Sequence, residues 1–196
     1  MKHASSLAAP LSRSTRRIEV WSEKGTVRGV LAPVLDEYGV GFRVMHGFGS
    51  PTAVHDVAEN YDGRTLIVLY VGDFDPSGLY MSEHDLPDRL ARYGGDHVEV
   101  IRIALDDDDV KRLPSFPASD KRGDPRYKWF AEKYGNQCWE LDAMDPNDLR
   151  TRVNEWIEQY LDKEAWERGI ELDKAEQESL RRHFAAWRSL GGEEVA

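Results

Sequence analysis

The pattern of apolar and polar positions divides the first hundred residues into alternating strands and helices. Short apolar or β-branched runs predict strands at 17–22, 40–48, 64–71 and 97–105. Between them, apolar residues spaced by three and four predict helices at 25–39, 51–61 and 81–94. The run at 64–71 is apolar at nearly every position, which is typical of a parallel strand buried on both faces.

Local signals mark the ends of two of these helices. Gly39 follows the first helical pattern and predicts its end, although Pro33 interrupts that pattern. Ser50 is a candidate N-cap with Pro51 at the first helical position of the next helix. Alternation of strands and helices with connections of helix length predicts an α/β fold, with a mainly parallel sheet of about four strands flanked by helices.

Beyond residue 106 the chain becomes polar, and two prolines with a Gly-Asp-Pro turn predict loops and short helices that wrap the core. Helical spacing returns at 146–190, and the amphipathic tail at 176–190 is expected to pack on the domain or on a partner. The predicted organisation is a disordered lead-in at 1–16, an α/β domain at 17–150 and a helical C-terminal extension at 151–196.

Acidic residues follow two of the predicted strands. Glu23 ends the first strand, and Asp73 and Asp75 end the third, at the edge where parallel α/β sheets bind ligands. Two carboxylates about 4 Å apart repel by about 4 kcal/mol at an effective dielectric of about 20. A hard cation such as Mg²⁺ binds carboxylate oxygens and would offset that repulsion. We therefore expect these three residues to be both metal ligands and catalytic residues, with Mn²⁺ as a substitute ion.

Three other interpretations of this stretch were weighed. A calcium loop beginning at Asp73 lacks the required glutamate, because His84 stands at its twelfth position. The stretch also resembles haloacid-dehalogenase-like phosphatases, in which Asp73 would be the nucleophile, Asp75 the acid/base, and the aspartates at 106–109 further ligands. Finally, Asp75 could simply cap the next helix. Because Glu23 lies at the same predicted edge, the metal site is the favoured interpretation.

Charge and composition narrow the class of protein. The 26 basic and 36 acidic residues give a net charge of −10, which argues against nonspecific binding of nucleic acid through a basic surface. The single cysteine, Cys138, excludes an intramolecular disulfide and fits a reducing, cytoplasmic setting. No apolar run is long enough to span a bilayer, so no membrane partner is expected.

Two groups of basic residues are candidate DNA contacts. Lys24 stands at the predicted start of the first helix, beside Glu23. The segment 120–130 interleaves aromatic residues with basic ones, a composition that suits backbone contact and base stacking. Its candidate contacts are Lys121, Arg122, Arg126 and Lys128, although the aromatics could equally pack onto the sheet.

Four segments together resemble the TOPRIM domain of topoisomerases, primases and related nucleases. They are "SEKGTVRGVL" (22–31), "HGFGSPTAVHDV" (46–57), "VGDFDPSGLYM" (71–81) and "CWELDAM" (138–144). The likeness is greatest to the A subunit of type IIB topoisomerases and its meiotic double-strand-break relatives, and it covers about residues 17–150. It implies a Rossmann-like fold, Mg²⁺ bound by Glu23, Asp73 and Asp75, and chemistry on a DNA phosphodiester.

The resemblance has one large departure. In those topoisomerases the tyrosine that attacks DNA lies on a winged-helix domain upstream of TOPRIM, whereas about seventeen residues precede the first predicted strand here. We therefore expect the nucleophile to come from a partner subunit, a homodimer, a missing domain or a metal-activated water. A phosphatase and a non-catalytic, DNA-associated regulatory module stay open as alternatives. A DNA enzyme of this kind would be cytoplasmic and nucleoid-associated.

Overall fold

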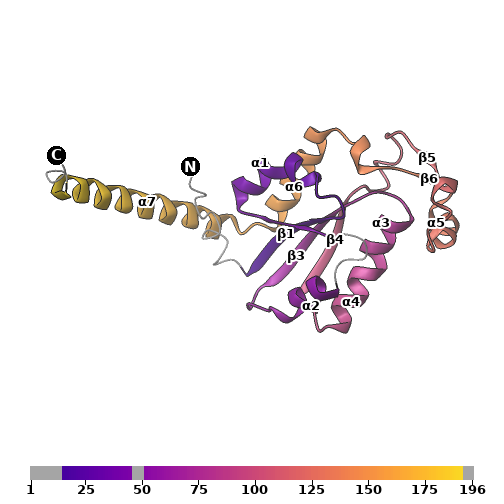
Figure 1. Cartoon of the computed structure of the whole chain (residues 1–196), viewed down its shortest axis with the longest axis horizontal. Coiled ribbons are helices and arrows are strands. Elements are labelled where there is room, and N and C mark those ends of the chain that lie inside the picture. Colours follow the sequence, from indigo (N-terminus) through magenta and orange to yellow (C-terminus); the bar gives the residue numbers. More distant parts are fainter. Residues whose placement is uncertain (1–14, 46–50, 192–196) are drawn as a thin grey trace.

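The computed structural model describes residues 15–45 and 51–191, which contain a four-stranded sheet (Figure 1). The strands, in the order β2-β1-β3-β4 across the sheet, are β1 (Arg16–Ser22), β2 (Gly41–Val44), β3 (Thr65–Val71) and β4 (Val98–Ala104). All three pairings are parallel. The α/β class and the parallel sheet predicted from the sequence are confirmed. The second strand is shorter than predicted, and Ser50 lies outside the described residues.

Helices cover both faces of the sheet (Figure 1). One face packs against α1 (Val27–Tyr38) and α6 (Pro146–Tyr160), and the other against α2 (Pro51–Glu59) and α4 (Leu86–Arg92). Successive side chains of a strand point to opposite faces. In β3, Ile67, Leu69 and Val71 accordingly join the first core, whereas Leu66, Val68 and Tyr70 join the second. This double burial explains why β3 has no polar face.

The first helix ends as its sequence predicts. Gly39 adopts the left-handed conformation with φ of 66°, and its backbone N–H donates to the carbonyl of Leu35. Pro33 lies inside α1, and the helix nevertheless buries Leu31, Val34 and Leu35 against the sheet. Tertiary packing therefore outweighs the local cost of this proline.

The helical segment after β3 begins earlier than the sequence predicts. The helix expected at 81–94 starts instead with α3 (Pro76–Tyr80), continues through the π-helical turn η2 (Met81–Asp85) and ends with α4. Asp75 is the N-cap and Pro76 occupies the first helical position. The Asp-Pro pair, interpreted as a turn, is in fact the start of a helix.

A series of short elements follows β4 and returns to the loop after β3. They are β5 (Phe116–Pro117), η3 (Ala118–Lys121), α5 (Tyr127–Tyr134), β6 (Gln137–Cys138) and η4 (Leu141–Ala143). β5 and β6 pair in antiparallel fashion. Trp139 and Phe74 exchange two backbone hydrogen bonds, of 2.9 and 3.0 Å. The loops and short helices expected here are present, and they cover the carboxyl end of β3.

The last two helices behave differently from each other. α6 buries Leu149, Val153 and Ile157 in the core beneath the sheet, so the predicted boundary at residue 150 falls inside it. α7 (Lys163–Gly191) packs only through its first turns, where Ala165 is buried, and then projects away from the sheet (Figure 1). The expectation that the segment 176–190 packs on the domain is wrong, because the large apolar side chains there are exposed. Within the described residues, no helix combines the length and apolar character needed to cross a membrane.

Gly78 is a position where a side chain has no room, which gives a first prediction. A Cβ atom at Gly78 would lie 2.3 Å from the carbonyl oxygen of Asp73. We expect Gly78→Ala to lower the free energy of unfolding by about 1–3 kcal/mol, as overpacking does, when measured by urea denaturation. The control is Gly29→Ala, because a Cβ on that residue of α1 meets nothing within 4 Å. That change should stabilise the protein by about 0.5–1 kcal/mol, and equal effects at both sites would contradict the prediction.

Candidate functional site

The three predicted carboxylates come together at the carboxyl ends of β1 and β3. The two strands are neighbours, and their register pairs Ser22 with Val71, so Glu23 and Asp73 follow directly on adjacent strands. From β1 the chain crosses to β2 on one side, and from β3 it crosses to β4 on the other. This point of divergence is where open α/β sheets place their ligands. The structure thus puts the predicted residues at the favoured position of the fold.

Asp73 is held by a backbone donor and a lysine. Its Oδ1 accepts the N–H of Leu141 at 2.7 Å and lies 3.0 Å from the Nζ of Lys24. Lys24 also lies 2.9 Å from Asp142. Burial lowers the pKa of Lys24, but its contacts with Asp142 and Asp73 raise the pKa by more. Lys24 is therefore a charged member of the site.

Asp75 uses its two oxygens for different partners. Its Oδ1 accepts the N–H of Gly78 at 2.8 Å and caps α3, as the turn interpretation expected. Its Oδ2 lies 3.1 Å from the Nζ of Lys121, which arrives from η3. Burial opposes the charge on Lys121, but the attraction of Asp75 leaves the pKa of this lysine raised. Capping accordingly occupies one oxygen of Asp75 and leaves the other facing a mobile cation.

Glu23 is the carboxylate whose needs are least satisfied. Its Oε1 is buried and has no hydrogen-bond partner in the protein. Burial raises the pKa of Glu23 to about 7, and the negative charges of Asp75 and Asp73 raise it further than burial alone would. Arg102 and a hydrogen bond from Ser77 act in the opposite direction. Glu23 therefore shares its surroundings with both aspartates and lacks a cation of its own.

Arg102 holds the loop that carries the two aspartates. Its Nη2 donates to the carbonyls of Gly72 and Asp73 at 2.8 and 2.5 Å, and its Nη1 donates to the carbonyl of Gly78 at 3.0 Å. Nε donates to Leu105 at 2.9 Å, and Nη1 also reaches the hydroxyl of Ser82 at 3.0 Å. The guanidinium thereby joins the start of the loop, the first turn of α3 and the end of β4.

A tyrosine hydroxyl lies buried in the same region. Tyr70 is fully buried, and its Oη has no hydrogen-bond partner in the protein. Burial raises the pKa of Tyr70, and the charge of Glu23 raises it further. Its ring lies under the guanidinium of Arg102, at 5.6 Å from the centroid. Burial keeps this hydroxyl away from any macromolecular substrate.

The candidate DNA contacts divide between the site and the surface. Lys24 and Lys121 bind the site carboxylates, as described above. Arg126 caps α5, pairs with Asp124 and lies over the ring of Tyr80. Arg122 and Lys128 are exposed. The interleaved aromatics Tyr127 and Trp129 pack against the core.

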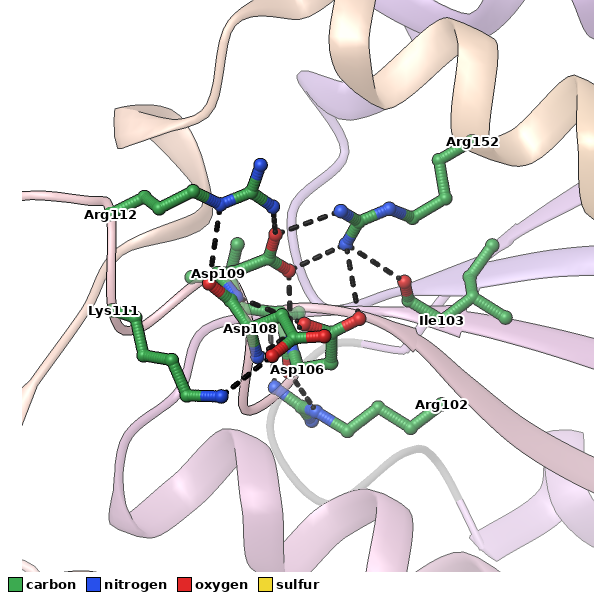
Figure 2. A network of polar contacts seen from close by, with 10 residues as sticks. Arg102, Ile103, Asp106, Asp108, Asp109, Lys111, Arg112 and Arg152 are labelled. Carbon is green, nitrogen blue, oxygen red and sulfur yellow. Dashed lines mark hydrogen bonds and ion pairs between the residues drawn. The ribbon is translucent and has the colours of Figure 1, made fainter.

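The run of aspartates at 106–109 forms a separate network (Figure 2). Asp109 is almost completely buried and binds Arg152 of α6 through both oxygens, at 2.5 and 2.8 Å. Arg152 also donates to the carbonyl of Ile103, and Lys111 pairs with Asp108. These contacts fasten α6 to the end of β4. The aspartates proposed as further ligands in the phosphatase interpretation are thus engaged by basic side chains.

The described residues contain no ready-made cluster of three or more His, Cys, Asp or Glu side chains arranged to hold a metal ion. The donor set nevertheless suits a hard cation, because it consists of carboxylate oxygens, one of them a buried atom without a partner. Sequence reasoning missed Arg102 and Tyr70. Arg102 had a signal, since it is a lone charged residue within the apolar run 100–105.

Removal of the Arg102 guanidinium should destabilise the fold. Arg102→Met leaves the carbonyls of Gly72 and Gly78 without this donor, so we expect a loss of about 3 kcal/mol or more in the free energy of unfolding. Arg102→Lys should recover only part of the loss, because one ammonium cannot reach all five acceptors. The control is Arg92→Met at the exposed end of α4, which should change stability by about 0.5 kcal/mol or less. A small effect at Arg102 in urea denaturation would contradict this role.

Glu23 should make the metal-free protein less stable as the pH rises. Its pKa is about 7 in the folded protein and 4.5 without these surroundings, so folding favours the protonated form and stability falls between those values. Glu23→Gln should therefore gain stability over wild type across this range and remain ahead above pH 7. The gain is at most about 3 kcal/mol, and solvent screening reduces it.

Thermal unfolding in chelator at several pH values measures this difference. Glu132→Gln, which removes a carboxylate from the exposed surface of α5, is the matched control. A pH-independent difference at Glu23, or an equal gain at Glu132, would show that the site does not destabilise the ionised glutamate.

Comparison of the chain with protein-family models, with curated proteins and with solved structures found no match. A functional assignment therefore rests on the residues and their arrangement. What the structure shows directly is an α/β domain with three acidic residues and two lysines gathered at the point where β1 and β3 diverge.

Proposed function

We propose that this chain carries a TOPRIM-type site for Mg²⁺-dependent cleavage or phosphoryl transfer at a DNA phosphodiester. One observation supports the metal most strongly. Glu23 places a buried, unpartnered oxygen beside two aspartates whose charges raise its pKa to about 7. Proteins do not gather three carboxylates at a ligand-binding edge for stability, since their repulsion costs free energy. A divalent cation would turn this cost into a favourable interaction.

The donors fit Mg²⁺ better than softer ions. Mg²⁺ binds through one or two carboxylates and retains several waters for substrate oxygens. Glu23 has a free oxygen, and the lysine-facing oxygens of Asp73 and Asp75 are held by cations that can move. When bound, the ion would stabilise negative charge on the scissile phosphate.

The protein's own residues have distinct tasks in this proposal. Arg102 fixes the loop, so that Asp73 and Asp75 keep their positions when the lysines move. Lys24 and Lys121, released from the aspartates, are available to bind phosphate oxygens of the substrate. Glu23, with a pKa of about 7, is suited to give or take a proton near neutral pH.

The assignment of DNA as substrate rests on the resemblance of the four segments to TOPRIM domains. The order of elements supports it, because a strand ending in Glu23 is followed by a helix, a strand, a helix and a strand ending in the two aspartates. Tyr70 is too deeply buried to attack DNA. The nucleophile in this proposal is therefore a tyrosine of a partner subunit or of a further domain, or a water molecule.

Titration calorimetry with Mg²⁺ and Mn²⁺ tests the metal site. Glu23→Gln and Asp73→Asn should each weaken binding by about tenfold or more, because each removes a charged ligand. The matched control is Asp107→Asn, which removes an exposed carboxylate from the run 106–109 and should bind as wild type does. Variants that bind metal as tightly as wild type would overturn the site.

A plasmid-nicking assay on the same samples tests the substrate. Nicking that needs the metal and is lost in Asp73→Asn supports DNA chemistry. A metal-dependent aspartyl-phosphate on Asp73 would instead indicate the phosphatase alternative. Metal binding without either reaction in the isolated chain would favour a regulatory module or a nucleophile from a partner, and adding a candidate tyrosine-bearing subunit would separate these two outcomes.

A further inference from the structure

The distal part of α7 exposes a stripe of large apolar side chains. Leu172, Leu180, Phe184 and Trp187 are 47, 56, 56 and 67% exposed. Leu180, Phe184 and Trp187 follow the spacing of one helical face, and Leu172 lies about two turns earlier. The domain does not use these residues, because α7 packs only through its first turns (Figure 1). Exposed apolar stripes of this kind mark interaction surfaces.

The charges along α7 are divided between its two halves. The six acidic residues all lie in the first part of the helix: Glu164, Glu167, Glu171, Asp173, Glu176 and Glu178. From residue 179 to 191 there is no Asp or Glu, and the charged residues there are Arg181, Arg182 and Arg188. The helix thus has an acidic amino-terminal half and a basic carboxyl-terminal half around its apolar stripe.

We propose that two copies of this chain associate through α7, with the two helices antiparallel. In that arrangement the basic half of each helix lies along the acidic half of the other, and the apolar stripes meet between them. A two-fold axis near Leu180 makes the same surface serve both copies, as an isologous interface requires. This pairing does not depend on the function proposed for the carboxylate site.

The division of charge selects the orientation. A parallel pair would set Arg181, Arg182 and Arg188 beside the same residues of the second copy, and acidic residues beside acidic ones. Like charges on neighbouring helices repel, whereas the antiparallel pair brings opposite charges together throughout. The occupant best matched to α7 is therefore α7 itself.

Analytical ultracentrifugation of the full chain tests the pairing. Across about 1–100 µM, the range in which weak interfaces dissociate, wild type should form a dimer. Leu180→Glu combined with Phe184→Glu should abolish it, since both changes put a charge into the apolar stripe. The matched control is Tyr61→Ala, which removes an exposed aromatic side chain outside α7 and should leave the dimer intact. A wild-type monomer throughout, or a dimer that survives the double change, would overturn the proposal.

Reversal of charge tests the orientation without assuming a register. Changing Arg181, Arg182 and Arg188 to Glu makes both halves acidic and should weaken the dimer about tenfold or more. Adding Glu171→Lys, Glu176→Lys and Glu178→Lys to that variant exchanges the two ends and should restore the dimer. Failure of the second set to restore association, with α7 still helical by circular dichroism, would overturn the antiparallel arrangement.

Discussion

The guanidinium of Arg102 is the interaction on which the geometry of the site depends. The loop after β3 must turn sharply from a buried strand into α3, and it would otherwise leave the carbonyls of Gly72, Asp73 and Gly78 without donors. Arg102 satisfies these carbonyls from the neighbouring strand β4. The close approach of Gly78 to the carbonyl of Asp73 is possible because Gly78 has no side chain. One cation and one glycine therefore fix the positions from which Asp73 and Asp75 act.

The charges of the site balance without a metal, and this balance is asymmetric. Asp73 pairs with Lys24 and Asp75 with Lys121, while Arg102 supports the backbone beneath them. Glu23 has no equivalent cation, and its raised pKa records that deficit. Two carboxylates are thus kept ionised by partners on flexible side chains, and the third carries the unsatisfied oxygen. Such an arrangement can exchange its lysines for another cation with little change in the fold.

The sequence was informative where local pattern and topology agree. Period-two burial on β3 and the placement of Glu23, Asp73 and Asp75 at strand ends followed from spacing alone, because adjacent parallel strands end at one edge. Lys121 could not be placed beside Asp75, since that contact joins segments far apart in the chain. Asp75 shows why the capping and ligand interpretations seemed exclusive. Each requires one oxygen, and a carboxylate has two.

The projecting helix and the carboxylate site lie at opposite ends of the sheet. Tyr160, which ends α6 shortly before α7 begins, lies under the guanidinium of Arg16 at the first residue of β1, whereas Glu23 follows the last residue of that strand. Association through α7 would therefore leave the edge around Glu23, Asp73 and Asp75 open to a large substrate. It would also set the acidic half of α7 against arginines, which lessens the repulsion that a net charge of −10 imposes on a polyanion. Separation of the two surfaces allows each to act without obstructing the other.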